Sequence, residues 1–146
     1  MSKRRPDITL DDLRGRAGTC LPGLFGLQVL HVDESELLMR MDIQPQFLAP
    51  NGFLHAASVI ALADTACGFA TIAHLPAGAE SFTTIELKSN FLGTARDGSI
   101  DAIARGVHIG RNTQVWDATV TDAGSGKTLA LFRCTQMILW PKAAAR

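Results

Sequence analysis

The hydrophobic positions of this chain mark six strand-like runs, two before and four after a single long helical stretch. In the run 36–43, Leu37, Met39 and Met41 stand at every second position, which is typical of a strand with one buried face. A run at 25–32 precedes it. Four later runs are joined by short connections containing glycine, which favours hairpins; they span 80–92, 99–109, 112–122 and 127–139.

Two stretches have helical character. The stretch at 54–74 is the longest apolar segment, about 21 residues or about 30 Å at ~1.5 Å per residue. The segment 7–17 predicts a short amphipathic helix with Thr9 or Asp7 as its cap, and Leu21-Pro22-Gly23 is expected to break it.

These elements predict an α+β fold, with the long helix packed on a curved antiparallel sheet of five to six strands. We expect an N-terminal arm with a short helix at 1–20, a single domain at 21–141 and a C-terminal tail at 142–146. The long helix is too apolar to be covered by this sheet alone. A second subunit is therefore expected to complete the architecture.

Composition and charge narrow the classes of function. The chain is 47% hydrophobic and 19% charged, and its net charge is zero, so nothing indicates a nucleic-acid partner. Its three cysteines lack metal-ligand spacing and fit reduced thiols in a cytoplasmic protein. The N-terminus has no signal-peptide pattern, and the long, alanine-rich helix is expected to be buried, with no membrane partner. We expect neither a metal nor a cofactor, because no such motif is visible.

Asp64 is the residue of the long helix that calls for a chemical explanation. It is the only acid between Asp42 and Glu80, and aspartate is unfavourable inside helices. On a helical wheel, the large apolar residues form one arc that we expect to face the sheet: Leu54, Leu62, Phe69 and Ile72. Asp64 lies on another face, where the neighbours are mostly small and a ligand or second helix could approach: Ala57, Ile60, Ala61, Gly68 and Thr71. A carboxylate in such surroundings is a candidate general base or nucleophile, with a pKa raised by desolvation.

The start of the same helix is a candidate oxyanion site. The first N–H groups of a helix lack internal acceptors, so those of His55 and Ala56 could polarise a carbonyl oxygen, and Asn51 could add its amide. His55 is expected to cap the helix start or support its loop, with a direct catalytic role as the alternative. It lies about 13.5 Å along the axis from Asp64 and out of phase with it. One helix cannot supply both ends of the site, which predicts an active site shared across a homodimer.

Two segments resemble the N-x-x-G-x-x-HGG…LxDxA signature of the PaaI-type (phenylacetate-pathway) hotdog thioesterases: Pro50-Asn51-Gly52-Phe53-Leu54-His55-Ala56-Ala57-Ser58 and Ala61-Leu62-Ala63-Asp64-Thr65-Ala66. The segments 84–92, 110–113 and 126–130 resemble later strands of that family, and the likeness spans about residues 24–140. The sequence departs from the signature in two ways: alanines replace both glycines after the histidine, and the spacing from Asn51 to His55 is shorter.

The resemblance implies a hotdog fold, an acyl-CoA substrate, and subunits that pair into dimers and often tetramers. It implies that Asp64 is the nucleophile or general base that activates water against the thioester carbonyl. The Ala56 N–H would bind the carbonyl oxygen, Asn51 would orient water or substrate, and Thr84 would hold the attacking water.

The same resemblance places Asn90 and Arg111 near the pantetheine and phosphates of CoA. The acyl pocket is expected to be lined by aromatic and aliphatic residues that suit a small-to-medium aryl or aliphatic group: Phe47, Leu48, Phe53, Phe82 and Phe91. Two alternatives stay open. One is a hotdog dehydratase or hydratase that uses His55, and the other is a non-catalytic acyl-CoA-binding protein.

Overall fold

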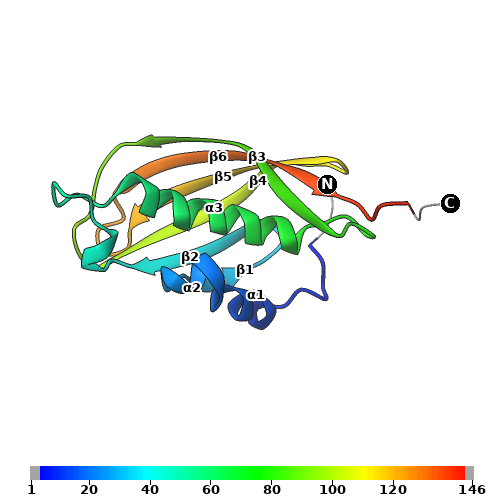
Figure 1. Ribbon diagram of the computed structural model, residues 1–146, viewed down its shortest axis with the longest axis horizontal. Helices are drawn as coiled ribbons and strands as arrows, with labels where there is room; N and C mark the ends of the chain where they lie inside the picture. The colour runs from blue at the N-terminus through cyan, green and yellow to red at the C-terminus, as the bar shows by residue number, and fades with distance from the viewer. Residues whose placement is uncertain (1–3, 144–146) are drawn as a thin grey trace.

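The computed structural model describes residues 4–143 and shows a long helix, α3 (Ala56–Ala73), lying along one face of a six-stranded sheet (Figure 1). The strands are β1 (Gln28–Val32), β2 (Glu36–Asp42), β3 (Ser81–Phe91), β4 (Ser99–Ile109), β5 (Thr113–Asp122) and β6 (Thr128–Leu139). Their order in the sheet is β1-β2-β4-β5-β6-β3, and every neighbouring pair is antiparallel. The predicted α+β arrangement is confirmed. β3 forms the edge opposite β1. The segment that joins β2 to β3, which contains α3, therefore crosses most of the width of the sheet.

Alanines on both layers explain how the helix packs on the sheet. On α3, Ala63, Ala66 and Ala70 have no exposed surface, and the inner faces of three strands, β4, β5 and β6, contribute further buried alanines: Ala102, Ala104, Ala118 and Ala130. Small side chains on both sides let a helix approach a sheet closely, so packing density is kept without large residues. The alanine-rich composition of the helix therefore serves burial in this protein.

The face of α3 that meets the sheet includes the predicted arc for the most part and is wider than predicted. Leu62 has no exposed surface and Leu54 and Phe69 are buried, but Ile72 is only partly so. The fully buried arc is centred on the alanines, which the wheel treated as neutral because it weighted large side chains. By length and composition α3 could cross a membrane, yet most of it is buried inside the protein.

The N-terminal region contributes two helices to the same core. In α1 (Leu10–Ala17), Thr9 forms a capping box with Asp12, which confirms one of the two predicted caps. The break predicted at Leu21-Pro22-Gly23 is wrong, because these residues lie in a short helix, α2 (Cys20–Leu24). Proline fits there because the first turn of a helix has no use for its missing N–H. Residues 1–3 of the predicted arm and 144–146 of the predicted tail lie outside the described residues.

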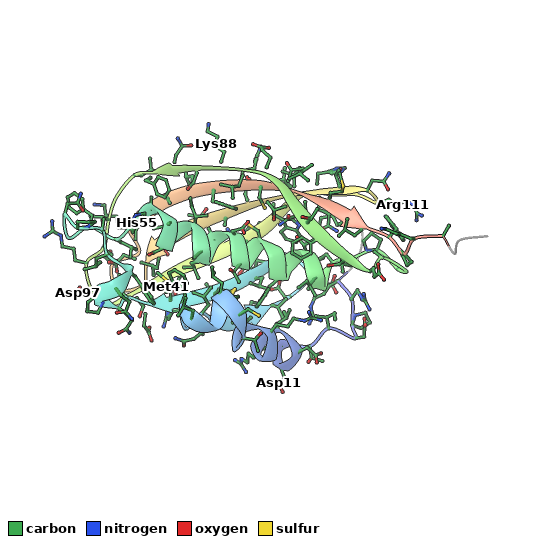
Figure 2. All side chains as sticks on the ribbon, in the orientation of Figure 1. Asp11, Met41, His55, Lys88, Asp97 and Arg111 are labelled. Carbon is green, nitrogen blue, oxygen red and sulfur yellow. The ribbon has the colours of Figure 1, made fainter. Side chains whose placement is uncertain are left out.

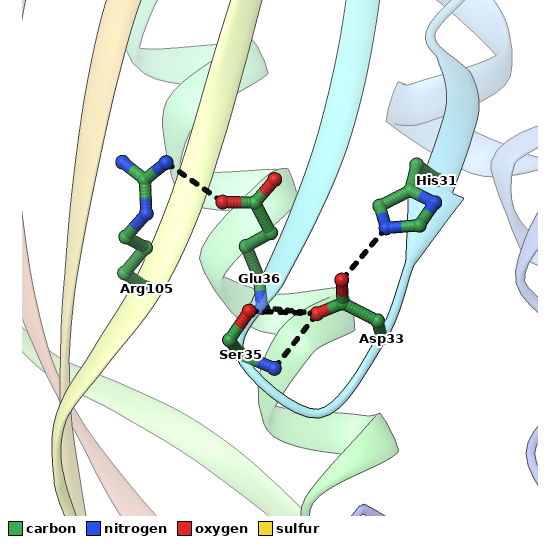
Figure 3. Close-up of polar contacts among 5 residues, drawn as sticks. All are labelled: His31, Asp33, Ser35, Glu36 and Arg105. Atoms are coloured by element: carbon green, nitrogen blue, oxygen red, sulfur yellow. Dashed lines mark hydrogen bonds and ion pairs between the residues drawn. The ribbon is translucent and has the colours of Figure 1, made fainter.

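The remaining boundaries agree closely with the sequence pattern. The strand predicted at 25–32 begins only at Gln28, because Phe25 ends α2. The loop before α3 contains a 3-10 turn, η1 (Pro45–Phe47). Between β1 and β2, Asp33 accepts hydrogen bonds from the Ser35 and Glu36 amides at 2.7 and 2.9 Å, and His31 lies 2.9 Å from its other oxygen (Figure 3). The His31 ring, followed by these amides, holds the pKa of Asp33 well below its usual range.

Candidate active site

The start of α3 is held in place from three sides. The Nδ1 atom of His55 accepts the Ala57 N–H at 2.9 Å, so His55 is the N-cap residue. The His55 N–H donates to the carbonyl oxygen of Phe47 at 3.0 Å, and Ser58 donates its hydroxyl to the same oxygen at 2.8 Å. From the β3–β4 connection, the Thr94 hydroxyl accepts the Leu54 N–H at 3.1 Å. The predicted capping role of His55 is what the structure shows.

This arrangement leaves one amide available at the helix start. The N–H groups of His55 and Ala57 are already engaged, whereas the Ala56 N–H has no hydrogen-bond partner among residues 4–143. Ala56 also lines an apolar cavity of about 250 Å³ together with Phe53, Leu54, Val59, Phe91, Gly93, Thr94 and Leu129. A free donor at the positive end of a helix, beside an apolar cavity, is suited to bind a carbonyl oxygen on which negative charge develops.

Asp64 lies farther along the helix and is partly buried. Its Oδ1 atom is inaccessible to solvent and has no hydrogen-bond partner within the described part of the chain. Burial raises the pKa of the Asp64 carboxyl above its ordinary value. The residue is eight positions after Ala56, about 12 Å along the axis. Within one chain, the candidate base and the free amide therefore do not meet.

Strand β3 runs antiparallel beside α3 and closes part of its small-residue face (Figure 1). A Cβ atom at Gly68 would lie 3.1 Å from the Cζ atom of Phe82, so the ring packs directly on the helix one turn after Asp64. Gly68 and Thr71 are consequently buried, whereas Ala57 is exposed. The small-residue face predicted from the wheel is therefore open only in its first half, up to Asp64.

Thr84 follows Phe82 on the inner face of β3 and joins a buried polar chain. Its hydroxyl donates to Oε1 of Gln136 at 2.7 Å, and the Gln136 amide donates to Cys134 Sγ at 3.5 Å. Cys134 is a neighbour of Cys67, the helix residue three positions after Asp64. Burial, reinforced by the Cys134 thiol, raises the pKa of Cys67 well above its usual range, so this thiol stays protonated.

The predicted substrate residues lie in four separate places. Phe53 and Phe91 share the cavity at the helix start, and Phe82 packs on Gly68. Asn90 lies on the outer face of the sheet, in a cleft of about 360 Å³ with Lys88, Asp117, Thr119 and Arg133, and Figure 2 shows Lys88 pointing away from α3. Arg111 stacks over Trp140 at 4.1 Å, at the end of the molecule opposite His55 (Figure 2).

The other pocket residues proposed from the sequence have local roles in this chain. Asn51 accepts the Phe53 N–H at 3.1 Å with its side-chain oxygen and is exposed. Phe47 is buried and stacks on Phe25, with 4.7 Å between the ring centroids. Leu48 is partly buried and forms an isolated bridge with Leu54.

Three polar residues of this region were missed in the sequence. Gln136 is fully buried, and Ser89, on the inner face of β3, has a buried hydroxyl without a partner in residues 4–143. Arg96 lies 4.9 Å above the Phe53 ring, at the cavity beside the helix start. A glutamine inside an alternating buried strand was the available signal, since Gln114 and Gln136 stand where apolar residues are expected. No group of three or more potential ligands among residues 4–143 is placed to hold a metal ion.

Comparison with known proteins adds a decisive observation. A family model described as Thioesterase superfamily matches residues 51–129, more than half of the chain. The chain belongs to the thioesterase superfamily. The match begins at the loop before α3 and therefore includes the Ala56 amide, Asp64 and Thr84.

Individual superfamily members are similar over most of their length. Acyl-coenzyme A thioesterase PaaI of Escherichia coli K12 is 30% identical over 110 residues, 75% of each chain. The 1,4-dihydroxy-2-naphthoyl-CoA hydrolase of Listeria monocytogenes is 27% identical over 111 residues, 76% of this chain and 89% of the relative. The crystal structure of a mutant of thioesterase PA1618 from Pseudomonas aeruginosa superposes with a TM-score of 0.87 at 26% identity, covering 94% of this chain and 99% of that one. The PaaI-type resemblance, the hotdog fold and the assignment as a thioester hydrolase are confirmed.

Proposed function

We propose that this thioesterase hydrolyses small-to-medium aryl or aliphatic acyl-CoA thioesters in the cytoplasm, with Asp64 as the catalytic carboxylate. The observation that carries the proposal is the buried Oδ1 atom of Asp64, which has no partner among the described residues. A buried polar atom is normally satisfied, so an unpartnered carboxylate oxygen in a half-open groove is suited to receive a proton from bound water.

The chemistry needs few groups because a thiolate is a good leaving group. In the proposed step, Asp64 takes a proton from water while the water oxygen attacks the thioester carbonyl carbon. The carbonyl oxygen becomes an oxyanion that accepts the Ala56 N–H. The C–S bond then breaks, the carbonyl re-forms as a carboxylic acid, and the CoA thiolate takes up the proton held by Asp64.

A homodimer supports this mechanism because it would bring the two parts of the site together. Strand β3 ends the sheet, and exposed apolar side chains lie along it and directly after it: Ile85, Leu87, Phe91 and Leu92, with 53, 40, 45 and 59% of their surface exposed. Long apolar edge strands normally need a partner. Antiparallel pairing of β3 with a second copy would set two α3 helices antiparallel, with Asp64 of one opposite Ala56 of the other.

A tetramer is a further element of the proposal. The outer face of β6 exposes Leu131, Met137 and Leu139 to 48, 43 and 37%. These residues lie on the face of the sheet opposite α3, where a second dimer would cover them.

The acyl group is proposed to enter the cavity at the helix start. Phe53, Phe91 and Leu129 give that cavity an apolar lining, which suits an aryl or a medium aliphatic group. One relative is named as a hydrolase of an aromatic acyl-CoA and another as an acyl-coenzyme A thioesterase. These names are compatible with an aryl substrate and with an aliphatic one.

The experiment that tests the proposal is release of free thiol from a panel of aryl and aliphatic acyl-CoA thioesters by wild type and Asp64→Asn. We expect release by wild type and a loss of about 10²-fold or more in the variant. Undiminished release by Asp64→Asn would contradict the mechanism. Binding without any release would favour the acyl-CoA-binding alternative, and hydration of an enoyl-CoA would favour the dehydratase, which the capping role of His55 does not support.

A further inference from the structure

The Thr84–Gln136 hydrogen bond determines which way the Thr84 hydroxyl points. An amide oxygen accepts and cannot donate, so the single hydroxyl proton of Thr84 is used in the 2.7 Å bond to Oε1 of Gln136. The Gln136 amide is itself oriented, because its Nε2 donates to Cys134 Sγ at 3.5 Å. Gln136 has no exposed surface, so this orientation is held by the core. The Thr84 oxygen therefore presents only lone pairs to the groove between β3 and α3.

The antiparallel course of α3 and β3 brings Thr84 to about the level of Asp64 along the groove. Phe82 marks one point of contact, because its ring lies against Gly68. From there, Thr84 is two residues along the strand, about 6.7 Å, in the direction of the helix start. Asp64 is four residues back along the helix, about 6 Å, in the same direction (Figure 1). Both residues therefore face the groove at nearly the same level.

The polar chain links the same two elements from behind. Gln136 bonds to Cys134, which neighbours Cys67 on the helix turn that carries Asp64. Thr84 and that helix turn therefore adjoin the same set of buried groups. A displacement of Gln136 would be transmitted to Thr84 while leaving the carboxyl itself intact.

We infer that Gln136 is a positioning residue, which turns Thr84 into a pure hydrogen-bond acceptor so that Thr84 and Asp64 each accept one proton of the attacking water. With both protons held, the lone pair of the water oxygen is free to face the thioester carbonyl carbon. The inference rests on the proposed hydrolysis at Asp64, and it adds a buried residue that does not touch substrate. Asp64 still removes the proton, and Thr84 only orients the water.

The test compares two buried glutamines that lie directly opposite each other on β5 and β6. Gln114 and Gln136 are cross-strand partners and neither has exposed surface, but the Gln114 amide bonds to the His74 carbonyl and to Trp116. In Gln136→Met we expect kcat to fall about tenfold with KM little changed. Gln114→Met should lower the unfolding temperature comparably and leave kcat of the folded enzyme at the wild-type value.

Variants of Thr84 complete the test and do not depend on the folding of Gln136→Met. Thr84→Ser, which retains the hydroxyl, should lose less kcat than Thr84→Val. Thr84→Val should lose about as much as Gln136→Met, and the double variant should lose no more than Thr84→Val alone. The acid limb of the pH profile should keep its midpoint in all of them, because Asp64 sets it.

Three results would overturn the inference: wild-type kcat in Thr84→Val, additive losses in the double variant, or an equal loss in Gln114→Met. Failure of the proposed function itself has a different signature, namely undiminished thiol release by Asp64→Asn.

Discussion

The ring of Phe82 packs so closely on Gly68 that a methyl group at Gly68 would lie 3.1 Å from Cζ of the ring. This contact closes the groove between α3 and β3 one helical turn beyond Asp64. The contact also explains why a glycine occupies position 68, although glycine inside a helix lowers its stability.

Gly68→Ala is therefore expected to destabilise the protein by about 1 kcal/mol, because the ring must shift to accept the methyl group. Gly15 in α1 is the matched control. A Cβ atom there meets nothing within 4 Å, so Gly15→Ala should stabilise the protein by up to about 1 kcal/mol through helix propensity. Urea unfolding of both variants measures the difference, and equal effects of the two substitutions would contradict the contact.

Asp64→Asn is expected to unfold at a higher temperature than wild type at neutral pH. Burial raises the pKa of Asp64 in the folded state, so the carboxyl ionises at a higher pH there than in the unfolded chain. Wild-type stability should thus fall, relative to Asp64→Asn, as pH rises from the unfolded to the folded pKa. Thermal unfolding of both proteins at a series of pH values measures this difference in stability. A difference in unfolding temperature that did not change with pH would contradict a raised pKa of Asp64.

The rate of hydrolysis should show an acid limb at a pH above the ordinary aspartate value of about 3.9. The reason is the same raised pKa, since the proposed base must be ionised to accept a proton. Thiol release from one acyl-CoA, measured between acid and neutral pH on enzyme shown to be folded, gives the midpoint. A midpoint at or below the ordinary value would argue against Asp64 as the group that titrates.

His55→Ala should lower stability by about 1 kcal/mol, because the Ala57 N–H loses its cap. His55→Asn is the control, since asparagine is a good N-cap residue, and it should retain both stability and most activity. Thermal unfolding and thiol release are measured on the same samples. If both variants lost activity equally while His55→Asn stayed stable, the imidazole would have a direct chemical role.

The sequence predicted the fold well because strand alternation and turn residues are local signals. All six strands and both predicted helices are present, and β4 has the predicted bounds. The edge position of β3 could not be predicted, since strand order depends on which long-range pairings bury most surface. The short helix α2 was missed because Pro22 and Gly23 signal a break when their neighbours in space are unknown. Gly23 in fact approaches the Gly18 carbonyl so closely that a Cβ atom would lie 2.7 Å from it.

The candidate site was predicted only in part, for a related reason. Asp64 stood out because a lone acid in an apolar helix is unusual, and the cap at His55 followed from its place at the helix start. Gln136 stood out only as a glutamine at an inward-facing strand position, and its role emerges when the pairing of β3 with β6 brings Thr84 against it. The separation of Asn90 and Arg111 from the helix start likewise depends on which face or end of the sheet each one occupies.

The shared active site is the central claim of the proposal, and mixed dimers test it most directly. Ala56→Pro removes the proposed oxyanion donor, and proline suits the first position of a helix after an extended residue such as His55. Ala56→Ser, which keeps the N–H, is its control. Ala56→Pro and Asp64→Asn should each be nearly inactive alone.

The deciding measurement is thiol release after the two inactive variants are unfolded together and refolded as an equal mixture. If each site takes Asp64 from one subunit and the Ala56 amide from the other, half of the dimers are mixed and each mixed dimer has one intact site. Activity should then return to about a quarter of the wild-type value. A mixture that forms mixed dimers but stays as inactive as its components would show that each subunit contains its own complete site, and would contradict the proposal.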